Sequence, residues 1–394
     1  MDENKNAPAL KRLKKPNPLL RLLALLTTAA LLLGAMILVI YRDTINMNTF
    51  KHWLDYQRMD TGATGESAPF SHAGGDKLSI AYLNSGVVTA SAAGAHYYGL
   101  DGQQLAEEVR SLENPVLTAS RSTAVVYDAG NQSLFAFRDG EKNFSLSLEG
   151  GADLLSARPN DGGWLAVTAQ QSGYKGAVTV YDRRGEPVIQ ISLSSTFAVD
   201  AAISPDGRTV AVVTIGQENG TFFSRLLLYS VDKTEPFAQL DLGGMTVLDM
   251  DFDLGVVWLV GEDRLLTVSL TPEGETVQTC FFSPSYLKGC SLGGDGFAFL
   301  LMGRYRSGSA DQALLVDSSA QVVQSIALTG QVLDYAAAGE YCALLTGSQL
   351  SVYNTSLEFV AGVENSRAAR RVDLNTNGSA LLANDQQAWL YIPQ

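Results

Sequence analysis

The sequence predicts an all-β fold, a β-propeller with eight blades favoured, preceded by one N-terminal transmembrane helix. From residue 76 onward, short runs rich in Val, Ile, Leu, Tyr and Phe alternate with Gly, Asp and Asn turns, which is the pattern of successive strands. These strands recur in units of similar length. Near the N-terminus, one uncharged apolar run has the length of a membrane span. The 37 glycines and 12 prolines agree with many tight turns rather than long helices.

The N-terminal part predicts a membrane anchor. Residues 1–21 form a basic tail, with six Lys and Arg against two acidic residues. Residues 22–41 (LLALLTTAALLLGAMILVIY) carry no charge, and at ~1.5 Å per residue a helix of this length crosses the ~30 Å hydrocarbon core. A cleaved signal peptide has a shorter apolar stretch and a small-residue cleavage site, so we expect an uncleaved anchor in the lipid bilayer. The positive-inside rule then predicts a single-pass protein of the cell membrane, with the tail cytoplasmic and the bulk extracytoplasmic.

Residues 42–75 are predicted to be a juxtamembrane helix and linker. Asn48 can cap a short helix in which Phe50 and Trp53 share one face. That face suits either the lipid interface or packing on the folded domain. Residues 60–68 (DTGATGESA) have the composition of a flexible spacer. The extracytoplasmic propeller itself is expected to occupy residues 76–394.

The strands group into units that each have the length of a four-stranded propeller blade. The spacing between opening strands is about 37 to 48 residues. Seven blades are the alternative, if the first unit is irregular. The opening strands are predicted to start near Leu78, Pro115, Ala152, Val199, Thr246, Lys288, Val332 and Arg371.

The turns within these units repeat as well. The motif SPDGR at residues 204–208 resembles the hairpin between the first two strands of many propeller blades, and NDGG (160–163) and NTNG (375–378) occupy the same place. Asp-Gly and Asn-Gly pairs supply the positive φ angles that tight hairpins require. The last unit has room for only three strands, so we expect a strand from residues 68–73 (APFSHA) to complete it and close the ring.

With this layout, the chain resembles a family of single-pass membrane proteins of unknown function from Gram-positive spore-forming bacteria. The resemblance covers nearly the whole chain and rests on the basic start, the single helix and the external propeller. It implies a location in the cell envelope and no particular activity. The D-x-x-G turns, such as DRRG at residues 182–185, are more distantly similar to those of quinoprotein-type propellers, which also serve as binding scaffolds.

Charge and cysteine content narrow the function classes. The tail has a net charge of +4 and the whole chain −13, which leaves −17 for the remainder. Such an acidic domain is repelled by phosphate backbones, so no nucleic-acid partner is expected. Three cysteines are too few for a disulfide scaffold. Cys280 and Cys290 can pair if they lie on neighbouring strands, or they can be free thiols that pack as small apolar residues.

The sequence predicts no catalytic residue, no cofactor and no metal site. Of the three histidines, His52 and His72 lie outside the main repeats, and His96 is read as an ordinary strand residue. Arg367, Arg370 and Arg371 form a basic cluster in the acidic domain, and guanidinium groups of this kind can bind a carboxylate or an acidic glycan. The competing interpretation is that these arginines, like the smaller pair Arg304 and Arg306, offset neighbouring acids.

We therefore expect a non-enzymatic, membrane-anchored binding or scaffolding protein of the cell envelope, with an envelope protein or polymer as its partner. Repeat architecture and predicted tethering support this function. The alternative is a propeller enzyme, either one that acts on envelope glycans or a quinone-cofactor dehydrogenase, with carboxylates in its central channel.

Overall fold

The computed structural model describes residues 62, 64–75, 77–271 and 274–393, together with Thr27 and Thr28. The chain divides into two compact units, Met1–Gln57 and Arg58–Gln394, and the second unit holds every strand described below. Apart from Thr27 and Thr28, the predicted tail, transmembrane helix and juxtamembrane helix lie outside the described residues. In the part of the chain that is described, no helix combines the length and the apolar character that a bilayer crossing requires.

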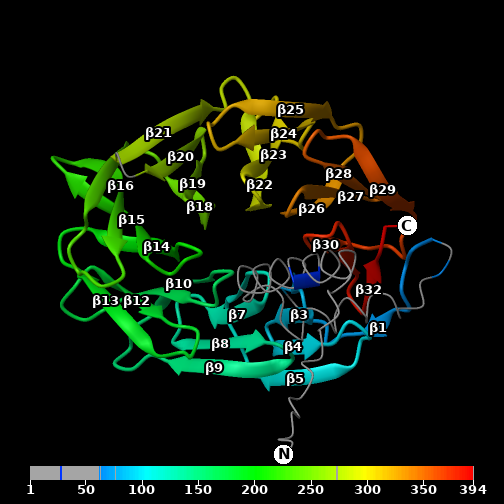
Figure 1. The fold of residues 1–394 in the computed structure, drawn as a ribbon, viewed down its shortest axis with the longest axis horizontal. Helices are drawn as coiled ribbons and strands as arrows, with labels where there is room; N and C mark the ends of the chain where they lie inside the picture. Colours follow the sequence, from blue (N-terminus) through cyan, green and yellow to red (C-terminus); the bar gives the residue numbers. More distant parts are fainter. Residues whose placement is uncertain (1–26, 29–61, 63, 76, 272–273, 394) are drawn as a thin grey trace, which may run out of the picture. The chain divides into compact units, whose positions relative to one another are not determined.

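The second unit is a ring of eight four-stranded antiparallel sheets, shown in Figure 1. This confirms the predicted eight-bladed propeller, and the seven-bladed alternative is wrong. Blade 1 comprises β2 (Ser79–Leu83), β3 (Gly86–Ser91), β4 (Gly94–Tyr98) and β5 (Gln104–Val109). Blade 2 comprises β6 (Pro115–Ala119), β7 (Thr123–Asp128), β8 (Ser133–Arg138) and β9 (Glu141–Ser147). Blade 3 comprises β10 (Leu154–Pro159), β11 (Leu165–Ala169), β12 (Gly176–Tyr181) and β13 (Pro187–Leu193). Blade 4 comprises β14 (Phe197–Ile203), β15 (Thr209–Glu218), β16 (Thr221–Ser230) and β17 (Ala238–Gly243).

The second half of the ring repeats the same order of strands. Blade 5 comprises β18 (Val247–Asp253), β19 (Val256–Gly261), β20 (Arg264–Thr271) and β21 (Gly274–Phe281). Blade 6 comprises β22 (Tyr286–Gly294), β23 (Phe297–Gly303), β24 (Gln312–Asp317) and β25 (Val322–Ala327). Blade 7 comprises β26 (Val332–Ala338), β27 (Tyr341–Thr346), β28 (Gln349–Asn354) and β29 (Phe359–Glu364). Blade 8 comprises β30 (Arg371–Leu374), β31 (Ala380–Ala383), β32 (Gln387–Tyr391) and the N-terminal strand β1 (Phe70–Ser71).

The opening strands begin at or close to the predicted positions. β6, β26 and β30 start at the predicted residues, and the other five start within about two residues of them. The second strand of most blades is buried almost throughout, as in β7, β19 and β23. Apolar side chains of neighbouring blades pack together, for example Val178 of blade 3 with Val212 of blade 4. The core therefore lies between the blades, and the first strand of each blade faces the axis of the ring.

The ring is closed by the two ends of the domain, as predicted. β1 pairs antiparallel with β32, with Phe70 opposite Ala388 and Ser71 opposite Gln387. Before β1, Glu66 forms a bridge with Tyr391. The Glu66 carboxylate accepts hydrogen bonds from the Trp389 indole Nε1 at 3.0 Å and from the Ser366 hydroxyl at 2.5 Å. Because Trp389 and Ser366 are buried, this carboxylate satisfies two donors that water cannot reach.

Antiparallel strands give the ring two distinct faces. We call the side where the first strand of each blade begins the start face; it also carries the turns between second and third strands. The end face carries the turns between first and second strands and between third and fourth strands. The predicted turns at residues 160–163, 204–208 and 375–378 all lie on the end face. Their glycines Gly163, Gly207 and Gly378 have φ angles of 81°, 71° and 81°, as the turn chemistry requires.

We predict that Glu66→Ala weakens the closed ring. The change leaves the buried indole N–H of Trp389 with only the Ser366 hydroxyl, at 3.1 Å, as a partner. A loss of about 1–3 kcal/mol in the free energy of unfolding is expected, measured by denaturant unfolding of the full chain. Thr64→Ala is the matched control, because Thr64 is exposed and only donates to the same carboxylate. Equal stability of Glu66→Ala and wild type would contradict this role of Glu66.

Candidate functional site: the central channel

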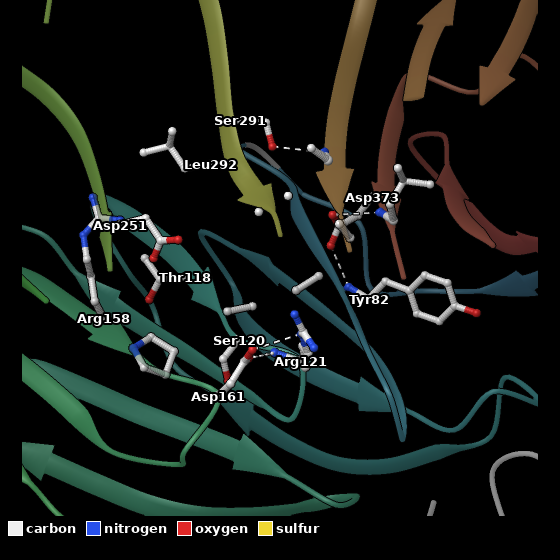
Figure 2. Close-up of a pocket in the computed structure, with 18 of the residues that line it drawn as sticks. Tyr82, Thr118, Ser120, Arg121, Arg158, Asp161, Asp251, Ser291, Leu292 and Asp373 are labelled. Carbon is white, nitrogen blue, oxygen red and sulfur yellow. Dashed lines mark hydrogen bonds and ion pairs between the residues drawn. The ribbon is translucent and has the colours of Figure 1, made fainter. Parts of the chain in front are cut away.

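The first strands of all eight blades surround a cavity of about 630 Å³ on the ring axis. Its lining is strongly charged and more acidic than basic. Figure 2 shows part of it, with Arg158 and Asp251 on one wall and Asp373 on another. Seven aspartates and three arginines line the cavity: Asp161, Asp249, Asp251, Asp253, Asp295, Asp334, Asp373, Arg121, Arg158 and Arg371.

Four aspartates occupy equivalent places in the first strands of blades 4, 5, 7 and 8. Each follows a hydrophobic residue, and each carboxylate accepts the amide of the next residue, as in Asp200 with Ala201 at 2.9 Å. In blades 4, 5 and 7 the strand register shifts just before this aspartate, so a β-bulge sets its position. Sequence reasoning missed this set, although the repeated hydrophobic-Asp pair was a visible signal. The four residues are Asp200, Asp249, Asp334 and Asp373.

Two of these carboxylates join one blade to the next. Asp334 accepts the amide of Val372 at 2.9 Å, which links blades 7 and 8. Asp373 accepts the amide of Tyr82 at 2.8 Å, which links blade 8 to blade 1, as Figure 2 shows. The carboxylates therefore satisfy backbone donors that face the channel, and they hold neighbouring first strands together.

Arg158 connects three blades on the opposite wall. Its guanidinium lies 2.7 Å from a carboxylate oxygen of Asp200 in blade 4 and 2.7 Å from one of Asp249 in blade 5. Burial alone would lower the pKa of Arg158, but the two carboxylates outweigh it and the pKa is raised. Arg158 is therefore permanently charged, and its guanidinium forms ion pairs with both carboxylates.

Two of the channel carboxyls, Asp251 and Asp373, have a pKa raised to about 7. Burial raises the pKa of Asp251 to about 7, against the lowering effect of the Phe252 amide. Burial likewise raises the pKa of Asp373 to about 7, although the amides of Tyr82 and Leu374 favour its charged form. A carboxyl with such a pKa can exchange a proton with a bound group. Asp373 is engaged with the backbone of blade 1, which leaves Asp251 as the channel carboxyl better placed for such exchange.

The structure separates the arginines that the sequence groups together. Arg367 lies over the Trp389 ring at 5.6 Å and donates to the Ser67 carbonyl at 3.2 Å, so it belongs to the ring closure. Arg370 is exposed and lies 3.8 Å from Asp385. Arg371 lines the central cavity. The three side chains do not form one site, and a binding role for any of them stays a prediction.

The smaller arginine pair and the remaining histidines lie away from the channel. Arg304 is largely exposed on the start face, 3.6 Å from Asp311. His72 contacts the Asn384 carbonyl beside the closing strand, and His96 is buried in β4. Neither histidine lines the cavity. Among the residues that the structure describes, no three His, Cys, Asp or Glu side chains are arranged to hold a metal ion.

The cysteines are free thiols in this structure. Cys280 lies in β21 of blade 5 and Cys290 in β22 of blade 6, so the two are not on paired strands of one sheet. Both pack against the apolar cluster that contains Trp258 and Phe282. They therefore act as small apolar residues, which is one of the two alternatives that the sequence left open. Cys290 also lines the central cavity.

Eight four-stranded blades, closed by an N-terminal strand around a polar channel, define this chain as a β-propeller protein. The chain belongs to the family of unknown function DUF5711, which matches residues 59–359. None of the curated proteins matches the chain.

Several solved structures share the fold at low sequence identity. BamB from Moraxella catarrhalis is 12% identical with a TM-score of 0.51, and the match covers 83% of this chain and 99% of that one. The computationally designed Ika8 protein is 12% identical with a TM-score of 0.58, covering 82% and 98%. Apo AztD from Citrobacter koseri is 12% identical with a TM-score of 0.52, covering 74% and 86%. At these identities the similarity establishes the propeller fold alone.

We predict that Asp251 makes stability depend on pH. Because the folded pKa is raised, its contribution to stability is full below the unfolded pKa and is lost as pH rises through about 7. Asp251→Asn keeps the shape without the charge. The variant should gain stability over wild type between about pH 4 and about pH 7, reaching on the order of 4 kcal/mol, measured by thermal unfolding across this range.

The control for this experiment is a carboxyl whose pKa is shifted in the opposite direction. Backbone amides, chiefly that of Glu186, lower the pKa of the partly exposed Asp182, so Asp182→Asn should lose stability at neutral pH and not in acid. A loss for Asp251→Asn that is present at neutral pH and disappears in acid would show that its carboxyl is ionised and stabilised in the folded protein, and would overturn the prediction.

Proposed function

We propose that this chain is a non-enzymatic, membrane-anchored extracytoplasmic protein that binds or scaffolds a protein or polymer of the cell envelope. The family assignment carries no activity, and the fold is shared by proteins too distant to lend one. The proposal therefore rests on the surface of the propeller, on the state of its channel carboxylates and on the predicted anchor.

The observation that carries the proposal is a set of exposed aromatic side chains on the start face of blades 3 to 6. Phe222 and Tyr305 are 69% and 73% exposed. Aromatic side chains are enriched at protein interfaces because they bury a large area with few rotatable bonds. We call this set the start-face aromatics: Tyr174, Phe197, Phe222, Phe281, Tyr286 and Tyr305.

The strongest projection of the start face comes from blade 4. β15 and β16 are ten residues each, and beyond Ile215 and Ser224 they pair only with each other. The ribbon ends in an Asn219-Gly220 turn in which both residues have positive φ, the geometry that a tight two-residue hairpin requires. Phe222 is therefore held on a well-defined ribbon, which lowers the entropy cost of using it as a contact.

Four carboxylates of the inner strands are engaged in structural contacts, which supports binding over catalysis for these four, while Asp251 is the channel carboxyl placed for proton exchange. Asp200, Asp249, Asp334 and Asp373 each accept a backbone amide, and the first two also neutralise Arg158. These groups are occupied in holding the blades together. A catalytic role would require breaking those bonds.

The point at which the chain enters the propeller lies on the face opposite the start-face aromatics. The chain enters the ring at the end face, where Glu66 lies opposite Tyr391 and the Ile392 amide donates to the Gly65 carbonyl at 2.9 Å. The start-face aromatics therefore lie on the other face from this entry point, and a partner that binds them does not contact the closing strand β1.

We expect the propeller to lie outside the cytoplasmic membrane. A lysine reagent that cannot cross membranes should label exposed Lys233 on intact cells, and the lysines of residues 1–21 only after lysis. Peptide mass mapping would measure both. The reverse pattern would overturn the proposed topology and leave the fold unaffected.

We further expect crosslinking from one face. A photo-crosslinking amino acid at Phe222 or Tyr305 should yield a discrete crosslinked species in cells, whereas the same residue at Arg208, which is exposed on the end face, should not. Phe222→Ser together with Tyr305→Ser should reduce crosslinking from a probe at Phe197 about tenfold or more without changing the melting temperature. Crosslinks confined to Arg208 would contradict the proposal.

A further inference from the structure

An ion pair spans the mouth of the channel on the end face. Arg121 lies in the turn between β6 and β7 of blade 2, and its guanidinium contacts the carboxylate of Asp295 in the turn between β22 and β23 of blade 6. Blades 2 and 6 stand on opposite sides of an eight-membered ring. Because both turns follow first strands, the contact lies across the opening that those strands surround.

A second carboxylate holds the same guanidinium from the side. Nε of Arg121 lies 2.9 Å from an Asp161 oxygen in blade 3, and the Arg121 amide donates to the other Asp161 oxygen at 2.9 Å. Figure 2 shows these two contacts. Asp253 of blade 5 lies close enough that both Arg121 and Asp295 influence its pKa, which burial above all raises. One cation is thus placed among acids from three blades.

The backbone at both ends of this bridge is fixed, so only side chains are free to move. The Arg121 carbonyl accepts the Asn84 amide of blade 1 at 2.8 Å, and the Asp295 amide donates to the Gly339 carbonyl of blade 7 at 2.8 Å. The Arg121 and Asp295 side chains are 42% and 35% exposed. An ion pair this exposed is weak and its side chains change rotamer rapidly. The bridge can therefore open without any movement of the blades.

We propose that Arg121 is a side-chain gate that controls the entry of small solutes into the central channel from the end face, closed by Asp161 and Asp295. The cavity behind it is large enough to admit small molecules. The gate goes beyond the proposed binding function, and it depends neither on the membrane anchor nor on a partner at the start face.

The channel contains its own reporter of access. Cys290 lines the cavity, Cys280 is partly exposed outside it, and Cys342 is fully buried in the core. The full chain is treated with iodoacetamide, a small neutral thiol reagent, and the rate at each cysteine is followed by peptide mass mapping. Cys280 reports the reagent at the surface, and Cys342 reports any unfolding of the domain.

Two variants open the gate in different ways. Arg121→Gln removes the bridging cation, and Asp295→Asn releases the far end while Arg121 keeps Asp161. Both should raise the rate at Cys290 about threefold to tenfold, as expected for a partly exposed ion pair, with Cys280 and Cys342 unchanged. Arg208→Gln is the matched control, because it removes a positive charge from the same face, where Arg208 lies 3.8 Å from Asp206 and away from the cavity lining.

The charge of the reagent separates gating from electrostatics. Loss of Arg121 also makes the mouth of the channel more negative. In Arg121→Gln, the rate of Cys290 modification should therefore rise more for a cationic methanethiosulfonate than for iodoacetamide, and less for an anionic one. If only the cationic reagent modifies Cys290 faster in the variant, the gate is disproved and Arg121 acts through its charge alone. Unchanged Cys290 rates in both variants would also overturn the proposal. If Arg121→Gln also raises the rate of Cys342 modification, the fold of that variant is loosened. In that case the Cys290 rate in Asp295→Asn alone tests the gate.

Discussion

The pairing of β1 with β32 is the contact on which the rest of this propeller depends. Without it, blade 8 has three strands and the ring has a free edge. The strand contributes only two residues, so side chains strengthen the closure: Glu66 binds the indole of Trp389, and Arg367 covers the same ring. Closure also creates the channel, because the first strands surround a common axis only while the ring is complete.

The centre of the ring is polar for a geometric reason. The first strands of eight blades surround a space that their side chains leave partly open, and an apolar lining there would remain in contact with water. Aspartates and Arg158 replace an apolar core in this region and tie neighbouring strands together. The same enclosure raises the pKa of Asp251 and Asp373, since nearby protein displaces the water that would stabilise their charge. The contacts that hold the first strands together and the raised pKa of Asp251 and Asp373 therefore have the same cause, the enclosure of polar groups at the centre of the ring.

Local chemistry explains what the sequence could predict. Turn residues and strand alternation act over a few neighbours, so the blade starts, the SPDGR turn at residues 204–208 and the closing strand could all be located. The channel could not, because its contacts join residues as far apart as Arg121 and Asp295. Closeness in sequence also gave a misleading prediction, the grouping of Arg367 with Arg370 and Arg371. Positive φ angles at Arg367 and Ala368 turn the chain between them, so these arginine side chains lie in different places. The inner-strand aspartates were recognisable by their repetition, and only their partners required the structure.

The two faces of the ring divide the proposed activities between them. The Glu66–Tyr391 bridge, where the chain enters the ring, and the Arg121 bridge belong to the end face, whereas the exposed aromatic side chains belong to the start face. A partner bound to Phe222 can influence Arg121 only through the blades, because each first strand runs from one face to the other. The most direct physical route passes along β18, since Asp249 binds Arg158 near its beginning and Asp253 lies beside the Arg121 bridge at its end. Such a rigid strand transmits displacement only if its neighbours have two arrangements. The hydrogen-bonded inner ring opposes that, so binding and gating should be independent of each other.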